Sequence, residues 1–182
     1  MRSKTESGFS FIDVMIAVTI LLLGILAFGA AMTGALVKTQ EDEQELVAKQ
    51  YATSTIEAIF SARDVYGRND KGGPNPGLGF DTAQNVKAGG PGIFVTGRQA
   101  IYSDDGPDNI TGTADDTGTA VVGFQRQIDI QNVNDANDDG KDDTTGLPVS
   151  LRRVTVTVYY NVNRIQRQVD VTTLIGDYNY LN

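Results

Sequence analysis

The chain has 182 residues, of which 15 are Lys or Arg and 23 are Asp or Glu, so its net charge is −8. This length is enough for one domain with a modest core, and the acidic balance offers no general electrostatic surface for nucleic acid, so we expect no nucleic-acid partner. The chain contains no His and no Cys, which removes the commonest general base, the usual transition-metal ligands, disulfide bonds and the conventional nucleophilic triads. We therefore do not expect an enzyme.

The first predicted element is a long apolar helix near the N-terminus. Residues 8–37 are almost wholly apolar, and the stretch from Val14 to Val37 gives 24 residues without a charge. At about 1.5 Å per residue this helix is long enough to cross a bilayer, where a helix is favoured because its backbone hydrogen bonds are internal. The leader carries Arg2 and Lys4, and an acidic cluster follows the apolar stretch. The charge difference orients the N-terminus toward the cytoplasm.

The run from Gly8 to Val14, Gly-Phe-Ser-Phe-Ile-Asp-Val, resembles the processing motif of type IV pilins and of type II secretion pseudopilins. In that motif a short basic leader ends in Gly, and Phe, a few apolar residues, an acid and a long apolar helix follow. The resemblance implies that a prepilin peptidase cleaves between Gly8 and Phe9 and then methylates the new amine of Phe9. One position departs from the family, because Asp13 stands where the usual acid is Glu.

Asp13 is the most informative charged residue of this stretch. A carboxylate inside an apolar helix is costly without a partner, so an acid at membrane depth indicates a functional role. The resemblance implies that Asp13 pairs with the positively charged first amine of a neighbouring subunit. The alternative is a solvated carboxylate at the depth of the lipid headgroups.

Two other interpretations of the apolar stretch remain open. A secretory signal peptide also has a basic start and an apolar core, and small residues make a cut after Gly29 or Ala31 conceivable. Its core, however, spans only about 7–15 residues. An uncleaved signal anchor is the other alternative. We favour prepilin processing over both.

The helix is predicted to continue through residues 38–66. Residues 38–63 contain no Gly or Pro, and one half of the helical wheel is apolar or small, as in a helix that buries one face. The residues of this half are Val47, Ala48, Tyr51, Ala52, Thr55, Ile56, Ile59 and Ala62. We therefore expect a domain to pack on this part of the helix, while residues 9–37 stay bare.

Residues 67–120 are predicted to form a variable loop region. The first part of this region is dense in Gly, Pro, Asn and Asp, which argues against a long regular element there. In pilin-like proteins the region between the helix and the sheet often makes subunit contacts. A solvent-exposed loop without a partner is the alternative, and both remain open.

The acidic loop 134–143 is a candidate calcium site. Its oxygen-bearing side chains alternate before a Gly that allows a sharp turn, a pattern that can surround a hard cation with about 6–8 oxygens. The candidate ligands are Asp135, Asn137, Asp139 and Asp143, with the backbone carbonyl of Lys141. The loop resembles the calcium loops of thrombospondin type 3 repeats and dockerins, and it departs from an EF-hand because Gly146 replaces the bidentate Glu. An ordinary polar turn uses the same residue types.

A second acidic loop, 103–116, is a weaker calcium candidate. Its carboxylates follow no recognisable ligand spacing. They belong to Asp104, Asp105, Asp108, Asp115 and Asp116.

Residues 121–182 are predicted to form an antiparallel β-sheet region. Three segments alternate apolar and polar residues, 122–131, 153–160 and 165–175, and the turn 161–163 is short enough for a hairpin. In the first segment one face carries Val122, Phe124, Arg126, Ile128 and Ile130. Three strands connected in this way favour a meander with one face on the helix. The predicted fold class is therefore α+β, a long N-terminal α-helix packed on a C-terminal antiparallel β-meander, which resembles the pilin fold.

Together these features predict a structural subunit of a type IV pilus or a type II secretion pseudopilus. They favour a minor subunit over a major one. After cleavage of the leader 1–8, the subunit would assemble through its N-terminal helix. The expected partners are like subunits in a helical filament, the prepilin peptidase, the inner-membrane assembly platform and, before assembly, membrane lipid. The chain would first be a single-pass inner-membrane protein and later part of a periplasmic or extracellular filament. The alternative is a bitopic, membrane-anchored calcium-binding adhesion or scaffold protein that does not polymerise.

Overall fold

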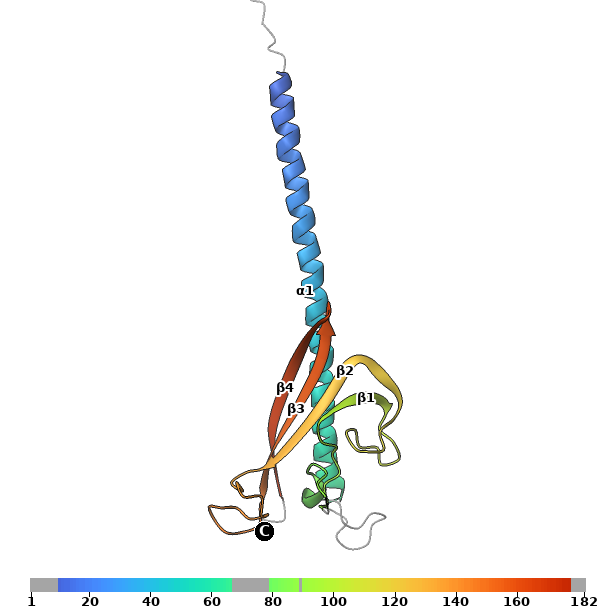
Figure 1. Ribbon diagram of the computed structural model, residues 1–182, viewed down its shortest axis with the longest axis vertical. Helices are drawn as coiled ribbons and strands as arrows, with labels where there is room; N and C mark the ends of the chain where they lie inside the picture. Colours follow the sequence, from blue (N-terminus) through green and yellow to red (C-terminus); the bar gives the residue numbers. More distant parts are fainter. Residues whose placement is uncertain (1–9, 67–78, 89, 178–182) are drawn as a thin grey trace, which may run out of the picture. The chain divides into compact units, whose positions relative to one another are not determined.

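The computed structural model describes residues 10–66, 79–88 and 90–177 (Figure 1). The fold class is α+β, as predicted, with one long helix packed on a four-stranded antiparallel sheet. In chain order the elements are α1 (Phe11–Tyr66), a short 3-10 helix η1 (Phe80–Thr82), β1 (Arg98–Asp104), β2 (Thr117–Asn132), β3 (Leu151–Val162) and β4 (Ile165–Gly176). The chain divides into two compact units, Met1–Asp42 and Glu43–Asn182, and the second unit contains the whole sheet.

The part of α1 in the second unit buries the face that the helical pattern predicts. All eight predicted residues are buried or half-buried, and the residues on the opposite half are exposed. Three of the buried positions, Ala48, Ala52 and Ala62, carry a single methyl group and are fully inaccessible. Small side chains allow the helix backbone to come close to the sheet, while Ile56 and Ile59 fill the space between them.

The sheet is a meander with the order β1-β2-β3-β4, and every neighbouring pair is antiparallel. Its core lies on the face that meets α1, where Val154, Val156 and Val158 of β3 are fully buried beside Ile128 and Ile130 of β2. The opposite face is polar and carries cross-strand contacts between side chains. This division is the alternation expected of an antiparallel sheet with one solvated face.

One residue of the predicted buried face is exposed. Val122 is 92 % exposed, so the face that it shares with Phe124 and Ile128 in the sequence pattern is not buried along its whole length. The pairing of β1 with β2 shifts between Ala100 and Tyr102, and Gly123 has a positive φ of 88° there. This irregularity interrupts the alternation that the sequence suggests, and the regular pairing that places side chains in the core begins only after it.

Two further details of the sheet differ from the sequence-based expectation. The meander has a fourth strand, β1, whose residues fall within the predicted variable loop region 67–120. The hairpin between β3 and β4 turns at Asn163 and Arg164, with Val162 paired to Ile165, rather than at 161–163. Both turn residues have positive φ, 49° and 70°, as a two-residue type I′ turn requires.

Replacing a buried valine of β3 should destabilise the domain far more than replacing the exposed valine of β2. Val156→Ala removes apolar atoms from a fully buried site, so we expect a loss of about 2–3 kcal/mol in the free energy of unfolding. Val122→Ala is the matched control and should change this value by less than about 0.5 kcal/mol. Urea denaturation of the full-length chain in detergent measures both, and equal losses would contradict the assigned core.

Candidate functional site

The N-terminal unit contains an apolar helix with no packing partner among the described residues. Every residue from 10 to 40 is exposed, including the large apolar side chains that surround the helix on all sides. By length and composition this part of α1 is able to cross a membrane. A helix that is apolar all round is stable only when lipid or protein covers it.

The hydroxyl groups of this helix are satisfied within the helix itself. Thr19, Thr33 and Thr39 each donate a hydrogen bond to the backbone carbonyl four residues earlier, over 2.8 to 3.0 Å. In an apolar surrounding an unpaired hydroxyl is costly, and this internal bond removes the cost. The threonines therefore do not interrupt the apolar character of the helix.

Asp13 lies in the first turn of α1 and takes part in its N-terminal cap. The backbone N–H of Ser10 donates to Asp13 Oδ2 over 3.3 Å, and the N–H of Ile12 donates to Ser10 Oγ over 3.4 Å. This arrangement resembles a capping box, in which the acid at the third helical position reaches back to the cap residue. A negative charge at this end also interacts favourably with the helix dipole. The cleavage site predicted at Gly8 and Phe9 lies outside the described residues.

In the acidic loop 134–143 the predicted ligand oxygens accept hydrogen bonds from the loop itself. Asp135 accepts the backbone N–H groups of Asp139 and Gly140 and the side-chain amide of Asn132. Further contacts of these side chains within the loop are Asp139 N–H to Asn137 Oδ1, Lys141 N–H to Asp139 Oδ1, Asn137 Nδ2 to Asp139 Oδ2 and Ala136 N–H to Asp143 Oδ2. The backbone N–H of Asp143 also donates to the carbonyl of Asn134. The backbone thus wraps around the carboxylate of Asp135, a residue that is only 9 % exposed.

These contacts lower the pKa of Asp135. Burial alone would raise the pKa of this carboxyl, but the hydrogen bonds from Asn132 and from the N–H groups of Asp139 and Gly140 stabilise the charged form and outweigh it. Within the described residues no group of three or more acidic side chains is arranged to hold a metal ion. The loop therefore uses its acids at least in part as acceptors for its own backbone.

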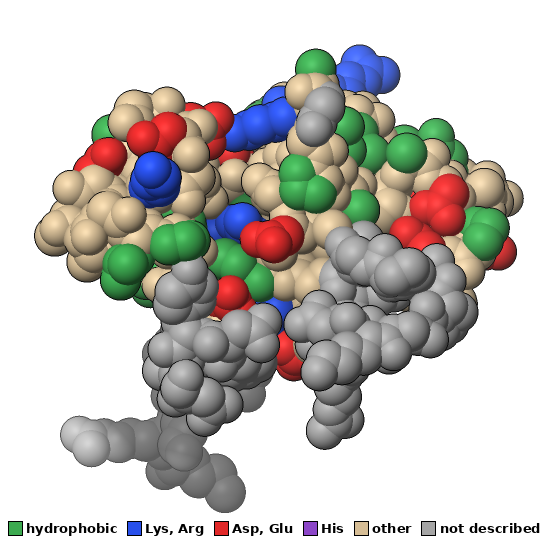
Figure 2. Space-filling model, turned by 90° about the horizontal axis from the view of Figure 1, so that it is seen from below, with side chains coloured by type: hydrophobic (Ala, Val, Ile, Leu, Met, Phe, Trp, Pro, Cys, Tyr) green, Lys and Arg blue, Asp and Glu red, His purple; other side chains and the backbone are tan. Residues whose placement is uncertain are grey.

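An open polar hollow of about 620 Å³ borders this loop and is lined mainly by residues from 84–96 and 129–138. An exposed ion pair between Lys87 and Asp138 connects its two sides. Seen from the end of the domain in Figure 2, the described surface mixes acidic, basic and neutral side chains, and hydrophobic side chains occur in small separate groups. The exposed ion pair between Lys87 and Asp138 contributes at most about 1 kcal/mol to the free energy of unfolding.

The weaker loop, 103–116, also uses its acids locally. Asp104 accepts the N–H of Gly106, and Asp108 accepts the N–H of Ile110, whereas Asp105 is exposed. Asp115 accepts the hydroxyl of Thr113 and the N–H of Asp108. Burial, together with the nearby Asp115 carboxylate, raises the pKa of Asp108, while the Thr113 hydroxyl lowers the pKa of Asp115.

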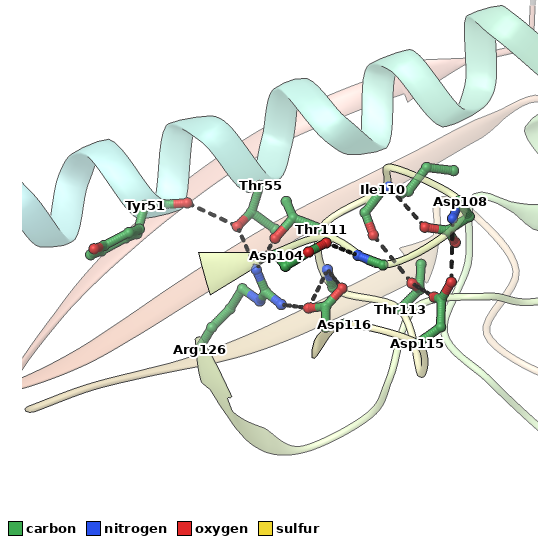
Figure 3. Close-up of polar contacts among 12 residues, drawn as sticks. Tyr51, Thr55, Asp104, Asp108, Ile110, Thr111, Thr113, Asp115, Asp116 and Arg126 are labelled. Carbon is green, nitrogen blue, oxygen red and sulfur yellow. Dashed lines mark hydrogen bonds and ion pairs between the residues drawn. The ribbon is translucent and has the colours of Figure 1, made fainter. Parts of the chain in front are cut away.

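Asp116, the fifth acid of this loop, forms a buried ion pair with Arg126 of β2 (Figure 3). Arg126 Nη2 lies 2.7 Å from Asp116 Oδ2, and the two side chains are 4 % and 7 % exposed. Arg126 Nη1 also donates to the hydroxyls of Thr111 and of Thr55 in α1, and Asp116 accepts the N–H of Gly112. One guanidinium therefore joins the helix, the loop and the sheet.

Two further buried polar residues, Asn85 and Arg152, connect the segment before β1 to the sheet. Asn85 donates to the carbonyl of Ile128 and accepts the N–H of Ile130, so it covers the edge of β2 beyond the end of β1. Arg152 donates to the carbonyl of Phe80 and to Asn132, and burial lowers its pKa. The sequence does not predict the roles of Asn85 and Arg152. For the ion pair between Asp116 and Arg126 it gives one signal, the charge of Arg126 among the apolar residues on one face of its strand.

Removing the Asp116 carboxylate should destabilise the domain strongly. Asp116→Ala leaves the Arg126 guanidinium buried without its charged partner, and we expect a loss of about 3–5 kcal/mol in the free energy of unfolding. Asp105→Ala, in the same loop and exposed, is the control and should cost less than about 0.5 kcal/mol. Urea denaturation distinguishes them, and a small effect of Asp116→Ala would contradict the structural role of the pair.

Acid should weaken the wild-type chain more than the Asp135→Asn variant. The folded-state pKa of Asp135 lies below its ordinary value, which is about 3.9. Its stabilising contribution is therefore complete above that value and disappears as the pH falls through the folded-state pKa. Unfolding measured between pH 6 and pH 2 should give a smaller decrease for the variant, which starts less stable at pH 6. Parallel curves would show that this carboxyl is not coupled to folding.

Comparison of the chain with protein-family models, curated proteins and solved structures found no match. The α+β fold class and the membrane-compatible helix follow from the structure itself. Functional inference therefore depends on the chemistry of the N-terminal residues and on what their helix is able to contact.

Proposed function

We propose that this chain is a structural subunit of a helical filament, of the type IV pilus or type II secretion pseudopilus kind, that assembles through its N-terminal helix. The observation that carries the proposal is the bare helix of residues 10–40, apolar on all sides and directly preceded by the Gly8-Phe9 motif. A bundle of like helices would cover this surface after the helix leaves the bilayer. The lack of cysteines favours a minor subunit, because many major pilins carry a C-terminal disulfide loop.

Before assembly, the same helix would hold the chain in the inner membrane. The basic leader favours a cytoplasmic N-terminus, and the acidic cluster after the apolar stretch favours the other side. The prepilin peptidase would then meet the Gly8-Phe9 bond on the cytoplasmic face, and the inner-membrane assembly platform would receive the cleaved chain. The second unit would be exported and would contribute the lateral contacts of the filament.

The proposed role of Asp13 is to neutralise the first amine of a neighbouring subunit. This carboxylate also accepts the N–H of Ser10 in its own helix, and an ionised carboxylate has capacity for both, because its two oxygens offer about four lone pairs. Capping needs only an acceptor, whereas neutralisation needs the charge. The two roles are therefore separable by substitution.

The N-terminal mass of the protein purified from its own membranes tests the proposal directly. Processing predicts a chain that starts at a methylated Phe9. A chain that starts at Met1 would indicate an uncleaved anchor, and a start at Ala30 or Met32 would indicate a secreted acidic domain. A start at Met1, Ala30 or Met32 would overturn the filament proposal.

Substitution of Asp13 should separate its charge from its capping role. Asp13→Asn keeps an oxygen for the Ser10 N–H but removes the charge, and Asp13→Ala removes both. We expect membrane insertion to survive in both variants and filament assembly to fail in both, as measured by the amount of sheared filament per cell. Normal assembly of Asp13→Asn alone would show that capping suffices, and normal assembly of both would contradict any partner for this acid.

The alternative function is a membrane-anchored calcium-binding adhesion or scaffold protein that does not polymerise. It is supported by the sequence of the loop 134–143, in which oxygen-bearing side chains alternate before Gly140. If calcium binds, its ligands would come from Asp135, Asn137, Asp139, Asp143 and the carbonyl of Lys141. Because the described acids do not form a ready metal-binding group, this function has less support than the filament.

Calcium binding predicts a melting temperature that depends on calcium. If the loop binds the ion in the folded state only, calcium should raise the melting temperature of the full-length chain and a chelator should reverse the rise. Asp139→Ala should abolish this rise in melting temperature. Asp105→Ala, in the other loop, should show how much of the rise depends on calcium at loop 103–116. An unchanged melting temperature would argue against structural calcium and leave the filament proposal unaffected.

A further inference from the structure

Both edges of the four-stranded sheet are open among the described residues. The outer strands are β1 and β4 (Figure 1), and neither makes a backbone–backbone hydrogen bond to a described segment outside the sheet. At the end of β4 the carbonyl of Gly176 accepts a hydrogen bond from Arg63 of α1. Five of the seven residues of β1 are exposed, and β4 pairs with β3 over twelve residue pairs without a register shift. Unpaired strand edges of this kind are templates for another strand.

The register shows which backbone groups of β4 point outward. The two-residue turn at Asn163 and Arg164 closes on the pair Val162 and Ile165, which is a hydrogen-bonded pair in such hairpins. Because hydrogen-bonding direction alternates along a strand, the even-numbered residues of β4 direct their N–H and C=O groups away from β3. Gln166, Gln168 and Asp170 therefore form a straight outer edge.

The outer edge of β1 follows from the same alternation. Asn85 bonds to Ile128 and Ile130, so the even-numbered residues of β2 face away from β3, and Gln99, opposite Arg126, bonds to β2. The backbone N–H and C=O groups of Ala100, the next residue, therefore point away from β2. The register shifts between β1 and β2 place the extra residues in β2, since Ala100 and Tyr102 are matched by Gln125 and Ala120, so β1 itself stays regular.

We propose that β4 of one copy pairs with β1 of the next copy, so that the sheets of neighbouring subunits join edge to edge. This inference rests on the proposed filament function, because in a polar helical filament all copies point the same way along the axis. A meander of four strands has edges that run in opposite directions, so β4 meets β1 of a copy with the same orientation as an antiparallel neighbour. Antiparallel pairing of two β4 strands would instead require copies that point in opposite directions.

The charges of the two edges are complementary in this arrangement. Antiparallel pairing of β4 with β1 of the next copy sets Asp170 opposite Arg98 in the register that we propose. In its own chain Arg98 lies over the ring of Tyr159 and donates a hydrogen bond to Gln166 Oε1, on the polar face that also carries Asp170. Pairing with Asp170 of the next copy would therefore replace these contacts. Opposite charges across strands each contribute about 0.2–1 kcal/mol, and like charges in the same places would oppose pairing.

Cysteine cross-linking of the full-length chain in filaments or native membranes tests the contact. In the register above, Gln168 of one copy lies opposite Ala100 of the next, at about 5.5 Å between Cα atoms, which suits a disulfide. The native chain has no cysteine, and the two edges of one sheet are about 14 Å apart, too far for a bond within one chain. The double variant Gln168→Cys with Ala100→Cys should therefore give a ladder of dimers, trimers and larger species on mild oxidation.

Two controls make the result specific. Gln168→Cys with Gln127→Cys moves the second thiol to β2, inside the sheet, and should give no ladder beyond what Gln168→Cys gives alone. In the cross-linking background Gln166→Pro removes an outward N–H without removing a bond to β3 and should suppress the ladder, whereas Gln166→Ala should keep it. Dimers from Gln168→Cys alone would indicate pairing of two β4 strands and would overturn the proposal.

The same samples separate this inference from the proposed function. If the N-terminal mass shows cleavage before Phe9 and filaments form, the absence of a ladder overturns the edge contact alone. If the chain starts at Met1, the filament function fails irrespective of the cross-links. A ladder in processed filaments supports both.

Discussion

The buried ion pair between Asp116 and Arg126 is the constraint on which the α+β domain depends. A guanidinium that is 4 % exposed needs a partner, because an unpaired charge in the interior costs several kcal/mol. Its partners come from a loop and from Thr55 of α1. The guanidinium is therefore fully satisfied only when the loop, the helix and the sheet all hold their native positions. Such an arrangement favours one relative position of these three parts over others that would bury the same apolar area.

The two units of the chain obey different rules for polar groups. In the domain every fully buried side-chain nitrogen and oxygen that the structure describes has a hydrogen-bond partner, often from a distant part of the sequence, as Asn85 and Arg152 show. In the N-terminal helix the polar side chains are satisfied within one or two turns. The first pattern fixes a tertiary structure, and the second leaves the helix independent of its neighbours.

The sequence predicts the helix and three strands because their side chains repeat with the period of the element. The strand β1 escapes prediction, since only Ile101 of its seven residues is fully buried and the strand shows no clear alternation. The partner of Arg126 escapes as well, because nothing in the spacing shows that Asp116 rather than a neighbouring acid reaches it. For the acidic loops the difficulty is chemical, as carboxylates at these positions suit both backbone N–H groups and calcium.

The self-contained threonines of α1 have a consequence for how freely that helix can change its surroundings. Thr19 and Thr33 donate their hydroxyl hydrogens to carbonyls of their own helix. Their side chains therefore expose a mainly apolar surface to the surroundings of the helix. Moving the helix from lipid into a protein bundle, or back, then breaks no hydrogen bond and requires none to form. The barrier to such a transfer would be set by shape and by a single carboxylate, which makes the exchange of surroundings reversible in principle.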